Sequence, residues 1–430
     1  SHACGRGGGG AVMGSKNLKA IIVQGTQKVP LADEKAFEEY VREVILPKFR
    51  NSDRVKKFGP FGTPGVLAIV NSQGILPTRN YQQGTFEGAA SIDGQAVKEA
   101  SIKHESCYRC PVACKPHTRI ESGEYAGYET EGPEYETLFS FGSNLGNANL
   151  GSIIAANKLC QLYGLDTIST GNVIGFAMEC FERGILRKED AGGIELRYGN
   201  HRALIPMIKK IAFRDGLGSI LAEGVKRAAE KIGKGAREYA MEVKGLEMSG
   251  YDPRGAKGMG IAYSTAPRGG CHQRGLVVQE TFGLPPFVDR FSTEGKGELV
   301  KTKQDEAAVQ DALGFCVFVS RGDPIGFPEF AEMFTKTTGV RVTTADLLKA
   351  GERIWNVERS YNLREGFKRK DDYLPKRFLE QPTAEGPTKG HVVELDELLN
   401  DYYKQRGWDP EGKITPGKLE ELGLKDLASR

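Results

Sequence analysis

Three cysteines lie close together in the segment Cys107-Tyr108-Arg109-Cys110-Pro111-Val112-Ala113-Cys114. Thiolates with this C-x2-C-x3-C spacing can bind zinc or an iron–sulfur cluster. Zinc sites more often use two C-x2-C pairs; the sequence has no second pair, although His104 and His117 flank the segment and could complete a zinc site. Three close cysteines with one remote cysteine are typical of a [4Fe–4S] cluster. We therefore favour a cluster over zinc, and either metal site over inert thiols.

A fourth ligand must come from another part of the chain. The candidates are Cys4, Cys160, Cys180, Cys271 and Cys316. Cys160 and Cys180 fall in apolar helical sequences, where a cysteine usually acts as a small buried hydrophobe. The stretches QLYGLD (161–166) and DALGFC (311–316) resemble each other, because each ends a helical pattern at Gly and presents a polar or soft side chain two positions later. Such matching helix ends indicate two related binding sites, and the second offers Cys316 as the fourth ligand.

Helices are expected to position these residues. Apolar periodicity predicts helices over 150–163, 173–183, 201–213, 220–232, from about 305, over 345–355 and over 395–405, and a helix from the N-cap Asp33 to Pro47. Residues 19–23 are predicted to form one short strand, and the rest of the sequence shows little strand pattern. Residues 244–275 are rich in glycine, which lets the backbone approach a ligand closely. The predicted fold class is mostly α.

Composition argues against several classes of protein. The net charge is only +3, and basic and acidic residues are interspersed, so the sequence does not indicate a basic surface for binding nucleic acid. No apolar run reaches the length of a membrane span. Eight cysteines in 430 residues are too few for a disulfide scaffold and indicate reduced thiols in a cytoplasmic protein. The sequence opens inside a glycine run, so we expect that an N-terminal portion is missing.

Several motifs together resemble the tungsten-containing aldehyde ferredoxin oxidoreductases over essentially the whole chain. Besides the cysteine segment they are RGGGGAVMGSK (6–16), EGPEYET (131–137), GLDT (164–167), PRGGCH (267–272) and ERSYNLREGF (358–367). The resemblance implies the multihelical two-domain C-terminal region of that fold, with a short remnant of a β-rich N-terminal domain. The implied units are the remnant at 1–29, a first helical domain at 30–240 with the cysteine segment and one pterin motif, and a second at 241–430 with the other pterin motif and the fourth cysteine.

The resemblance also implies two cofactors. One is a [4Fe–4S] cluster on Cys107, Cys110, Cys114 and Cys316. The other is a tungsten bis-molybdopterin, with molybdenum left open because both metals use the same pterin. Residues that match the paired D-x-x-G-L-(C/D) pterin motifs, or other pterin contacts, are Arg6, Gly7, Gln161, Gly164, Leu165, Asp166, Thr167, Arg274, Asp311, Gly314 and Phe315. Gln161 stands where the family usually has Asp, and Phe315 where it has Leu.

A Glu and a His near the metal are implied as the proton-transfer pair. His272 matches the His. The EGPEYET motif offers Glu131, Glu134 and Glu136, of which we choose Glu136, with Glu134 second. The implied reaction oxidises an aldehyde to a carboxylic acid with oxygen from water. Electrons then pass through the cluster to ferredoxin or another electron-transfer subunit. A homodimer is left open.

Three alternatives are considered. A tungsten-dependent aromatic acyl-CoA reductase would use an active-site subunit of the same fold. A non-catalytic iron–sulfur electron carrier or a zinc-binding module would leave the pterin motifs and His272 unexplained. Because the pterin site of the resembled family needs the N-terminal domain, we also expect residues 1–430 alone to be inactive.

Overall fold

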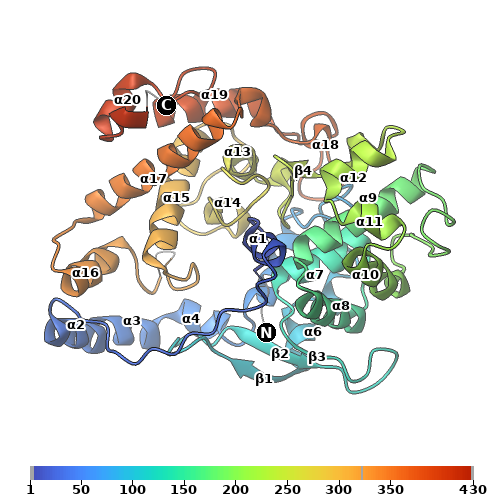
Figure 1. Cartoon of the computed structure of the whole chain (residues 1–430), viewed down its shortest axis with the longest axis horizontal. Coiled ribbons are helices and arrows are strands. Elements are labelled where there is room, and N and C mark those ends of the chain that lie inside the picture. Colours follow the sequence, from blue (N-terminus) through green and yellow to red (C-terminus); the bar gives the residue numbers. More distant parts are fainter. Residues whose placement is uncertain (1–3, 321–322, 428–430) are drawn as a thin grey trace.

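The computed structural model of the protein describes residues 4–320 and 323–427. Figure 1 shows α7 to α12 gathered on one side of the molecule and α15, α16 and α17 on the other. The α-helices are α1 (Gly9–Ser15), α2 (Glu34–Tyr40), α3 (Leu46–Asn51), α4 (Asp53–Phe58), α5 (Val66–Ser72), α6 (Gly94–Glu99), α7 (Tyr135–Phe141), α8 (Leu150–Tyr163), α9 (Thr167–Glu182), α10 (Leu204–Phe213), α11 (Leu217–Leu221), α12 (Val225–Ile232), α13 (Lys257–Thr265), α14 (Val278–Thr281), α15 (Lys296–Leu313), α16 (Phe327–Thr338), α17 (Thr344–Arg364), α18 (Lys376–Glu380), α19 (Leu395–Arg406) and α20 (Pro416–Glu421). The mostly α class predicted from the sequence is confirmed.

Most predicted helices are present. The helix predicted over 150–163 is α8, and Asp33 caps α2 by accepting a hydrogen bond from the Ala36 N–H at 2.9 Å. The prediction that Pro47 ends its helix is wrong. A wider π turn, in which Leu46 N–H donates to Val41 C=O, leads into α3, where Pro47 lies in the first turn and needs no N–H donor.

Strand is sparse, as expected, and most of it forms a small sheet that flanks the cysteine segment. Strands β1 (Ser101–Glu105), β2 (Lys115–Arg119) and β3 (Glu129–Glu131) pair antiparallel in the order β1-β2-β3, and β4 (Glu242–Val243) pairs with β5 (Leu246–Glu247). The sequence concealed these strands because their side chains are mainly charged. Cross-strand ion pairs such as Arg119–Glu129 at 2.7 Å take the place of an apolar face.

Residues 19–23 do not form the predicted strand. They are part of an extended segment that follows α1, and Ile22 and Val23 are 94% and 84% exposed. A strand needs a neighbour for its backbone hydrogen bonds, and within 4–320 and 323–427 no segment pairs with these residues. The described part of the predicted 1–29 unit therefore contains a helix and an extended segment, without the β-structure that the resemblance implied.

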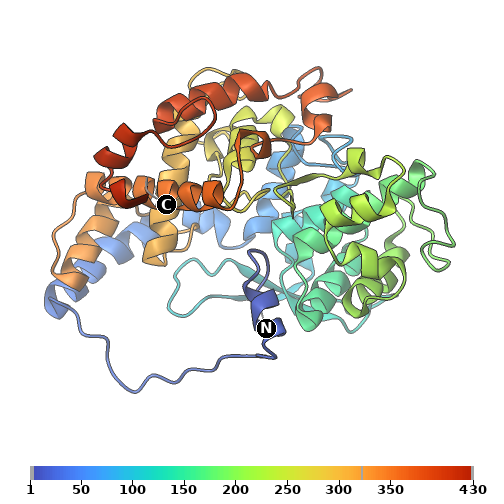
Figure 2. The same cartoon turned by 45° about the horizontal axis from the view of Figure 1, so that its top comes forward.

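Two hydrophobic cores hold the helices together. The larger core joins both sides of the molecule, since Phe139 of α7, Phe176 of α9, Met259 of α13 and Tyr402 of α19 are all fully buried in it. The domain boundary predicted at 240/241 stays a prediction. A smaller core lies between α2, α3 and α16, and Figure 2 shows these elements at the edge of the molecule. Among the described helices, none combines the length and apolarity needed to cross a membrane.

Candidate active site

Helices α8 and α15 end in the same way. Gly164 and Gly314 follow them in nearly identical left-handed conformations, with φ 72° at both and ψ 30° and 21°. In each case the next N–H returns to the last turn: Leu165 N–H donates to Cys160 C=O at 2.9 Å, and Phe315 N–H to Gln310 C=O at 3.0 Å. This is the Schellman arrangement, which glycine favours because it has no Cβ. The predicted pair of matching helix ends is confirmed.

Side chains beyond the first helix end tie it to the centre of the molecule. Asp166 caps α9 by accepting from Ser169 N–H at 2.7 Å and lies 3.4 Å from the Arg6 guanidinium. Arg6 also donates to the backbone carbonyls of Glu247 at 2.8 Å and Gly270 at 3.0 Å. Thr167 shares a hydrogen bond of 2.9 Å with Thr137 of α7. Arg6 thus links the first helix end to the glycine-rich segment that carries His272.

Two of the predicted pterin residues contact other protein groups. The Gln161 amide accepts from Thr130 Oγ1 at 3.0 Å and donates to Glu131 C=O at 3.0 Å. The side-chain oxygen and the side-chain N–H of Gln161 are thus both bonded to residues of β3, which explains how an amide can replace the usual Asp here. Gly7 has a φ of 71° and lies against the Arg268 side chain.

A buried arginine holds the second helix end. Arg274 is ion-paired at 2.6 Å both with Asp311 and with Glu358 of α17, and its guanidinium lies over the Trp355 ring at 5.2 Å. Arg274 is only 10% exposed, whereas Asp311 is 54% exposed and can still meet a ligand. Sequence reasoning did not identify Glu358 as part of this site, although it opens the ERSYNLREGF motif. Phe315 stacks on Phe330 at 4.3 Å, which accounts for an aromatic residue in place of leucine.

Glu136 and His272 face each other at the centre. Glu136 is in the first turn of α7, which is buried along nearly its whole length. Its Oε1 lies 3.4 Å from His272 Nδ1, and its Oε2 accepts from Gly250 N–H at 2.9 Å. His272 follows Gly269, where a Cβ would lie 2.1 Å from Val243 C=O, so only glycine allows the segment to pack against β4 and β5. His272 Nε2 lies 2.8 Å from the Gln273 amide nitrogen.

The environment of Glu136 suits proton transfer. Burial raises the pKa of Glu136 to about 7, against the opposing effects of Gly250 N–H and Arg6. Glu134 instead accepts a hydrogen bond from Thr63, and Glu131 pairs with Lys115 at 2.6 Å. Of the three motif glutamates, the structure brings Glu136 to His272.

The four predicted cluster cysteines are neighbours. Burial raises the pKa of the Cys114 thiol to about 12, and the nearby Glu134, Cys316 and Cys110 raise it further. Burial likewise raises the pKa of Cys316, as do Cys110 and Cys107, while the backbone N–H groups of residues 318 and 319 oppose that rise. The structure thus brings the remote Cys316 to the segment 107–114.

One of the two flanking histidines of the zinc alternative, His117, contacts carboxylates of the sheet. His117 lies between Glu105 at 3.1 Å and Glu129 at 2.8 Å across the sheet. Within 4–320 and 323–427, no three His, Cys, Asp or Glu side chains are grouped closely enough to share one metal ion. In a [4Fe–4S] cluster each thiolate binds its own iron, so the ligands stand further apart.

Comparison with known proteins agrees with this geometry. The family model described as "Aldehyde ferredoxin oxidoreductase, domains 2 & 3" matches residues 39–424. The chain belongs to the aldehyde ferredoxin oxidoreductase family. It is 46% identical to the tungsten-containing aldehyde ferredoxin oxidoreductase of Pyrococcus horikoshii and 45% identical to that of Thermococcus kodakarensis, each over 99% of this chain and 70% of the relative. The resemblance inferred from the motifs is confirmed, and the chain is an enzyme of this oxidoreductase family.

More distant relatives share the fold. The chain is 33% identical to the WOR-like subunit of an aliphatic sulfonate oxidoreductase of Pyrococcus furiosus, over 98% of this chain and 66% of that subunit. Among solved structures, the active site complex BamBC of benzoyl coenzyme A reductase with 1,5-dienoyl-CoA matches with a TM-score of 0.77 at 22% identity, over 98% of this chain and 69% of that one. At this identity the likeness shows the fold alone.

The residues fit the cofactors that the family name and the motifs imply. Glu136 Oε1 is buried and faces His272 at 3.4 Å without accepting a hydrogen bond from the described residues, so it can still accept one from a bound group. The exposed Asp311 lies at the second helix end, which duplicates the geometry of the first. The backbone N–H groups of residues 318 and 319 lower the pKa of the Cys316 thiol and so favour the thiolate, the form that binds iron.

Proposed function

We propose that this chain is the helical part of a tungsten-pterin oxidoreductase that oxidises aldehydes to carboxylic acids. Water supplies the oxygen, and the electrons leave through a [4Fe–4S] cluster to ferredoxin or another electron-transfer subunit. The observation that carries the proposal is the buried Glu136–His272 pair, 3.4 Å apart, on a segment that Arg6 joins at Gly270 to the first helix end. The identity to tungsten-containing relatives supports the choice of metal.

The chain offers residues for both cofactors. Cys107, Cys110, Cys114 and Cys316 would hold the cluster. The two helix ends, with Asp166, Thr167, Asp311 and the bridging Arg6 and Arg274, would hold the pterins. When bound, these cofactors supply the oxidant for the aldehyde and a path for its two electrons.

Glu136 and His272 would transfer the protons of the proposed reaction. Conversion of an aldehyde and water to a carboxylic acid releases two protons together with the two electrons. With a pKa of about 7, Glu136 is partly ionised at neutral pH and can take a proton from the attacking water. His272 Nδ1 faces Glu136 at 3.4 Å while its Nε2 accepts a hydrogen bond from the Gln273 amide, so the imidazole can take a proton from Glu136 and pass it on.

The proposal includes the cellular compartment of the protein. All eight cysteines are free, and a cluster with thiolate ligands persists best in a reducing compartment, so we place the protein in the cytoplasm. The homodimer stays a prediction.

Substitution of the central pair tests the function. In the full-length protein, Glu136→Gln and His272→Ala should each lower aldehyde turnover about a hundredfold, with a viologen as electron acceptor, since that is the usual scale for loss of a positioned acid or base. Tungsten and iron content should stay normal. Glu134→Gln is the matched control and should lower turnover much less. Unchanged turnover in Glu136→Gln and His272→Ala would refute the assignment.

Metal analysis of the purified protein separates the alternatives. Tungsten together with iron and sulfide supports the proposal, iron and sulfide alone supports an electron carrier, and zinc alone supports a zinc module. Turnover of an aromatic acyl-CoA without aldehyde oxidation would support the reductase alternative.

A further inference from the structure

The surface around the cluster cysteines is open to solvent and carries apolar side chains. Cys107 and Cys316 are both exposed. Tyr108, which directly follows Cys107, is 88% exposed, and Ile102 of β1 is 42% exposed. Aromatic residues are enriched where proteins contact one another. Tyr108 therefore indicates a contact site beside the cysteines.

Helix α4 packs against both parts of the chain that supply the cysteines. The Phe58 side chain at its end belongs to the smaller hydrophobic core together with Val112. A Cβ on Gly59 would lie 2.8 Å from Val112 C=O, so the backbones of the two segments are in close contact. The Phe58 ring also lies 5.1 Å from the ring of Phe318, two positions after Cys316. Residues at the end of α4 thus lie beside the cysteines.

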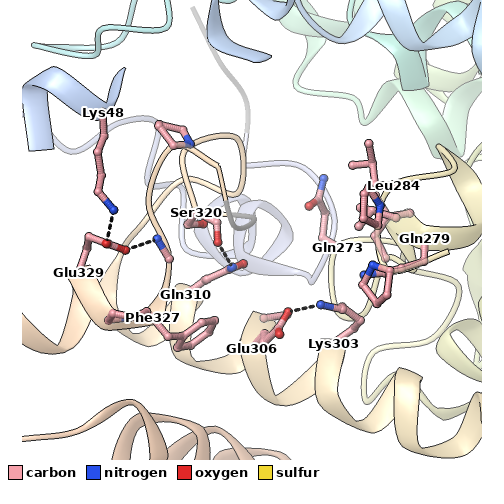
Figure 3. Close-up of a pocket in the computed structure, with 18 residues that line it drawn as sticks. Lys48, Gln273, Gln279, Leu284, Lys303, Glu306, Gln310, Ser320, Phe327 and Glu329 are labelled. Carbon is pink, nitrogen blue, oxygen red and sulfur yellow. Dashed lines mark hydrogen bonds and ion pairs between the residues drawn. The ribbon is translucent and has the colours of Figure 1, made fainter. Parts of the chain in front are cut away.

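Contacts with the helical body fix the position of α3 and α4. Lys48 of α3 is ion-paired with Glu329 of α16, as Figure 3 shows. Phe49 is buried in the smaller core. Ser52 caps α4 by accepting from Val55 N–H at 3.1 Å. The backbone that carries the exposed side chains of this segment therefore has a defined place next to the cysteines.

The segment 50–57 is strongly basic. It contains Arg50, Arg54, Lys56 and Lys57 against Asp53 alone, a surplus that equals the net charge of +3 of the whole chain. The rest of the chain is therefore neutral on balance. Lys56 lies 3.6 Å from Asp53. Arg50 and Lys57 are exposed, and within 4–320 and 323–427 neither has a carboxylate at ion-pair distance.

The cysteine segment adds a further cation. Arg109 is exposed, and its guanidinium lies over the Tyr108 ring at 5.3 Å. It forms no ion pair with the described residues, whereas Lys103 of β1 pairs with Glu105 at 2.6 Å. Apolar side chains thus lie next to unpaired cations. We call this region the cluster-side basic surface; it comprises Arg50, Lys56, Lys57, Ile102, Tyr108 and Arg109.

We propose that the cluster-side basic surface docks a small acidic electron-carrier protein, which receives the electrons of the reaction there. This inference rests on the proposed function and specifies its partner. Opposite charges on two proteins accelerate their encounter. Nucleic acids and lipid headgroups are also anionic, but they cannot accept electrons, so the exposed cysteines favour a redox protein.

The electron count favours a transient complex. Oxidation of one aldehyde to the acid releases two electrons, and a one-electron carrier accepts one of them. Two carriers must therefore bind, be reduced and leave in each turnover. Exposed charges around a small apolar centre suit this sequence, because they speed association without the large apolar interface that makes complexes permanent.

Reduction of an acidic plant-type [2Fe–2S] ferredoxin by the full-length protein and an aldehyde tests the docking surface. Its kcat/KM should fall at least tenfold between about 20 and about 300 mM NaCl, because salt screens the attraction. At the lower salt concentration, Lys56→Glu/Lys57→Glu should reduce kcat/KM at least tenfold. Turnover with a saturating viologen should stay within about twofold of wild type. Iron content and thermal unfolding verify that the variant is intact.

Arg187→Glu/Lys188→Glu is the matched control. It makes the same change in net charge at two exposed residues of the loop after α9, on the opposite side of the molecule from α4 (Figure 1). It should leave kcat/KM for ferredoxin within about twofold of wild type. Equal losses in the two double variants would overturn the surface assignment, as would a wild-type kcat/KM that does not change with salt.

Calorimetric titration with the oxidised ferredoxin separates this inference from the proposed function, since it needs no aldehyde. The full-length protein should bind ferredoxin at low salt, and Lys56→Glu/Lys57→Glu should weaken binding at least tenfold. If this is found but no aldehyde is oxidised, the docking proposal stands and the proposed function fails. If aldehydes reduce viologen but ferredoxin neither binds nor is reduced, aldehyde oxidation stands and the docking proposal fails. Binding of anionic lipid vesicles without binding of ferredoxin would also overturn it, in favour of a lipid surface.

Discussion

Replacement of Glu136 by glutamine should stabilise the fold, and only at neutral and alkaline pH. Burial raises the pKa of the Glu136 carboxyl from an ordinary value of 4.5 to about 7. The folded protein thus holds this proton more tightly than the unfolded chain. The stabilising contribution of the protonated carboxyl is fully present below about pH 4.5 and is lost as the pH rises through about 7.

The size of the effect follows from the difference between those two pKa values. About 2.5 pKa units correspond to about 3 kcal/mol of unfolding free energy. Glutamine has nearly the same shape and cannot ionise. Above about pH 8 the Glu136→Gln protein should therefore be up to about 3 kcal/mol more stable than the wild type, and below about pH 5 the two should converge. The opposing effects of Arg6 and Gly250 N–H are already contained in the pKa of about 7.

Urea unfolding followed by tryptophan fluorescence at pH 5, 6, 7 and 8 measures this difference. Glu43→Gln is a suitable control, because the Glu43 side chain is 67% exposed and pays little desolvation cost. The reasoning would be refuted if the difference between Glu136→Gln and wild type were the same at all four pH values, or if the wild type were the more stable protein at pH 8.

Three further predictions concern the cofactors and the position of His272. Cys316→Ser should lose most of the protein-bound iron and sulfide, whereas Cys160→Ser, buried within α8, should keep both; equal iron in the two proteins would contradict the ligand set. Arg274→Met should reduce tungsten content several-fold and leave iron unchanged, because it removes both ion pairs at the second helix end. Gly269→Ala, whose Cβ would lie 2.1 Å from a backbone oxygen, should displace His272 and lower turnover at least tenfold, and wild-type turnover would argue against this role for the glycine.

Features that depend on neighbouring residues in the chain could be predicted from the sequence. The ends of α8 and α15 were predictable because a Schellman turn involves only the last helical turn and the glycine after it. The Asp33 cap is local for the same reason. The cysteine spacing and the ordered motifs were enough to identify the family, which the comparisons confirm.

Contacts between distant segments were decided by the tertiary structure. The motif 131–137 offered three similar glutamates, and only the packing of α7 against the glycine-rich segment determines that Glu136 meets His272. The second ion-pair partner of Arg274, Glu358, likewise cannot be recognised in a linear pattern. Residues 19–23 failed as a strand for the same reason. β-branched and other apolar side chains favour an extended backbone, but a strand forms only where another segment supplies backbone hydrogen bonds.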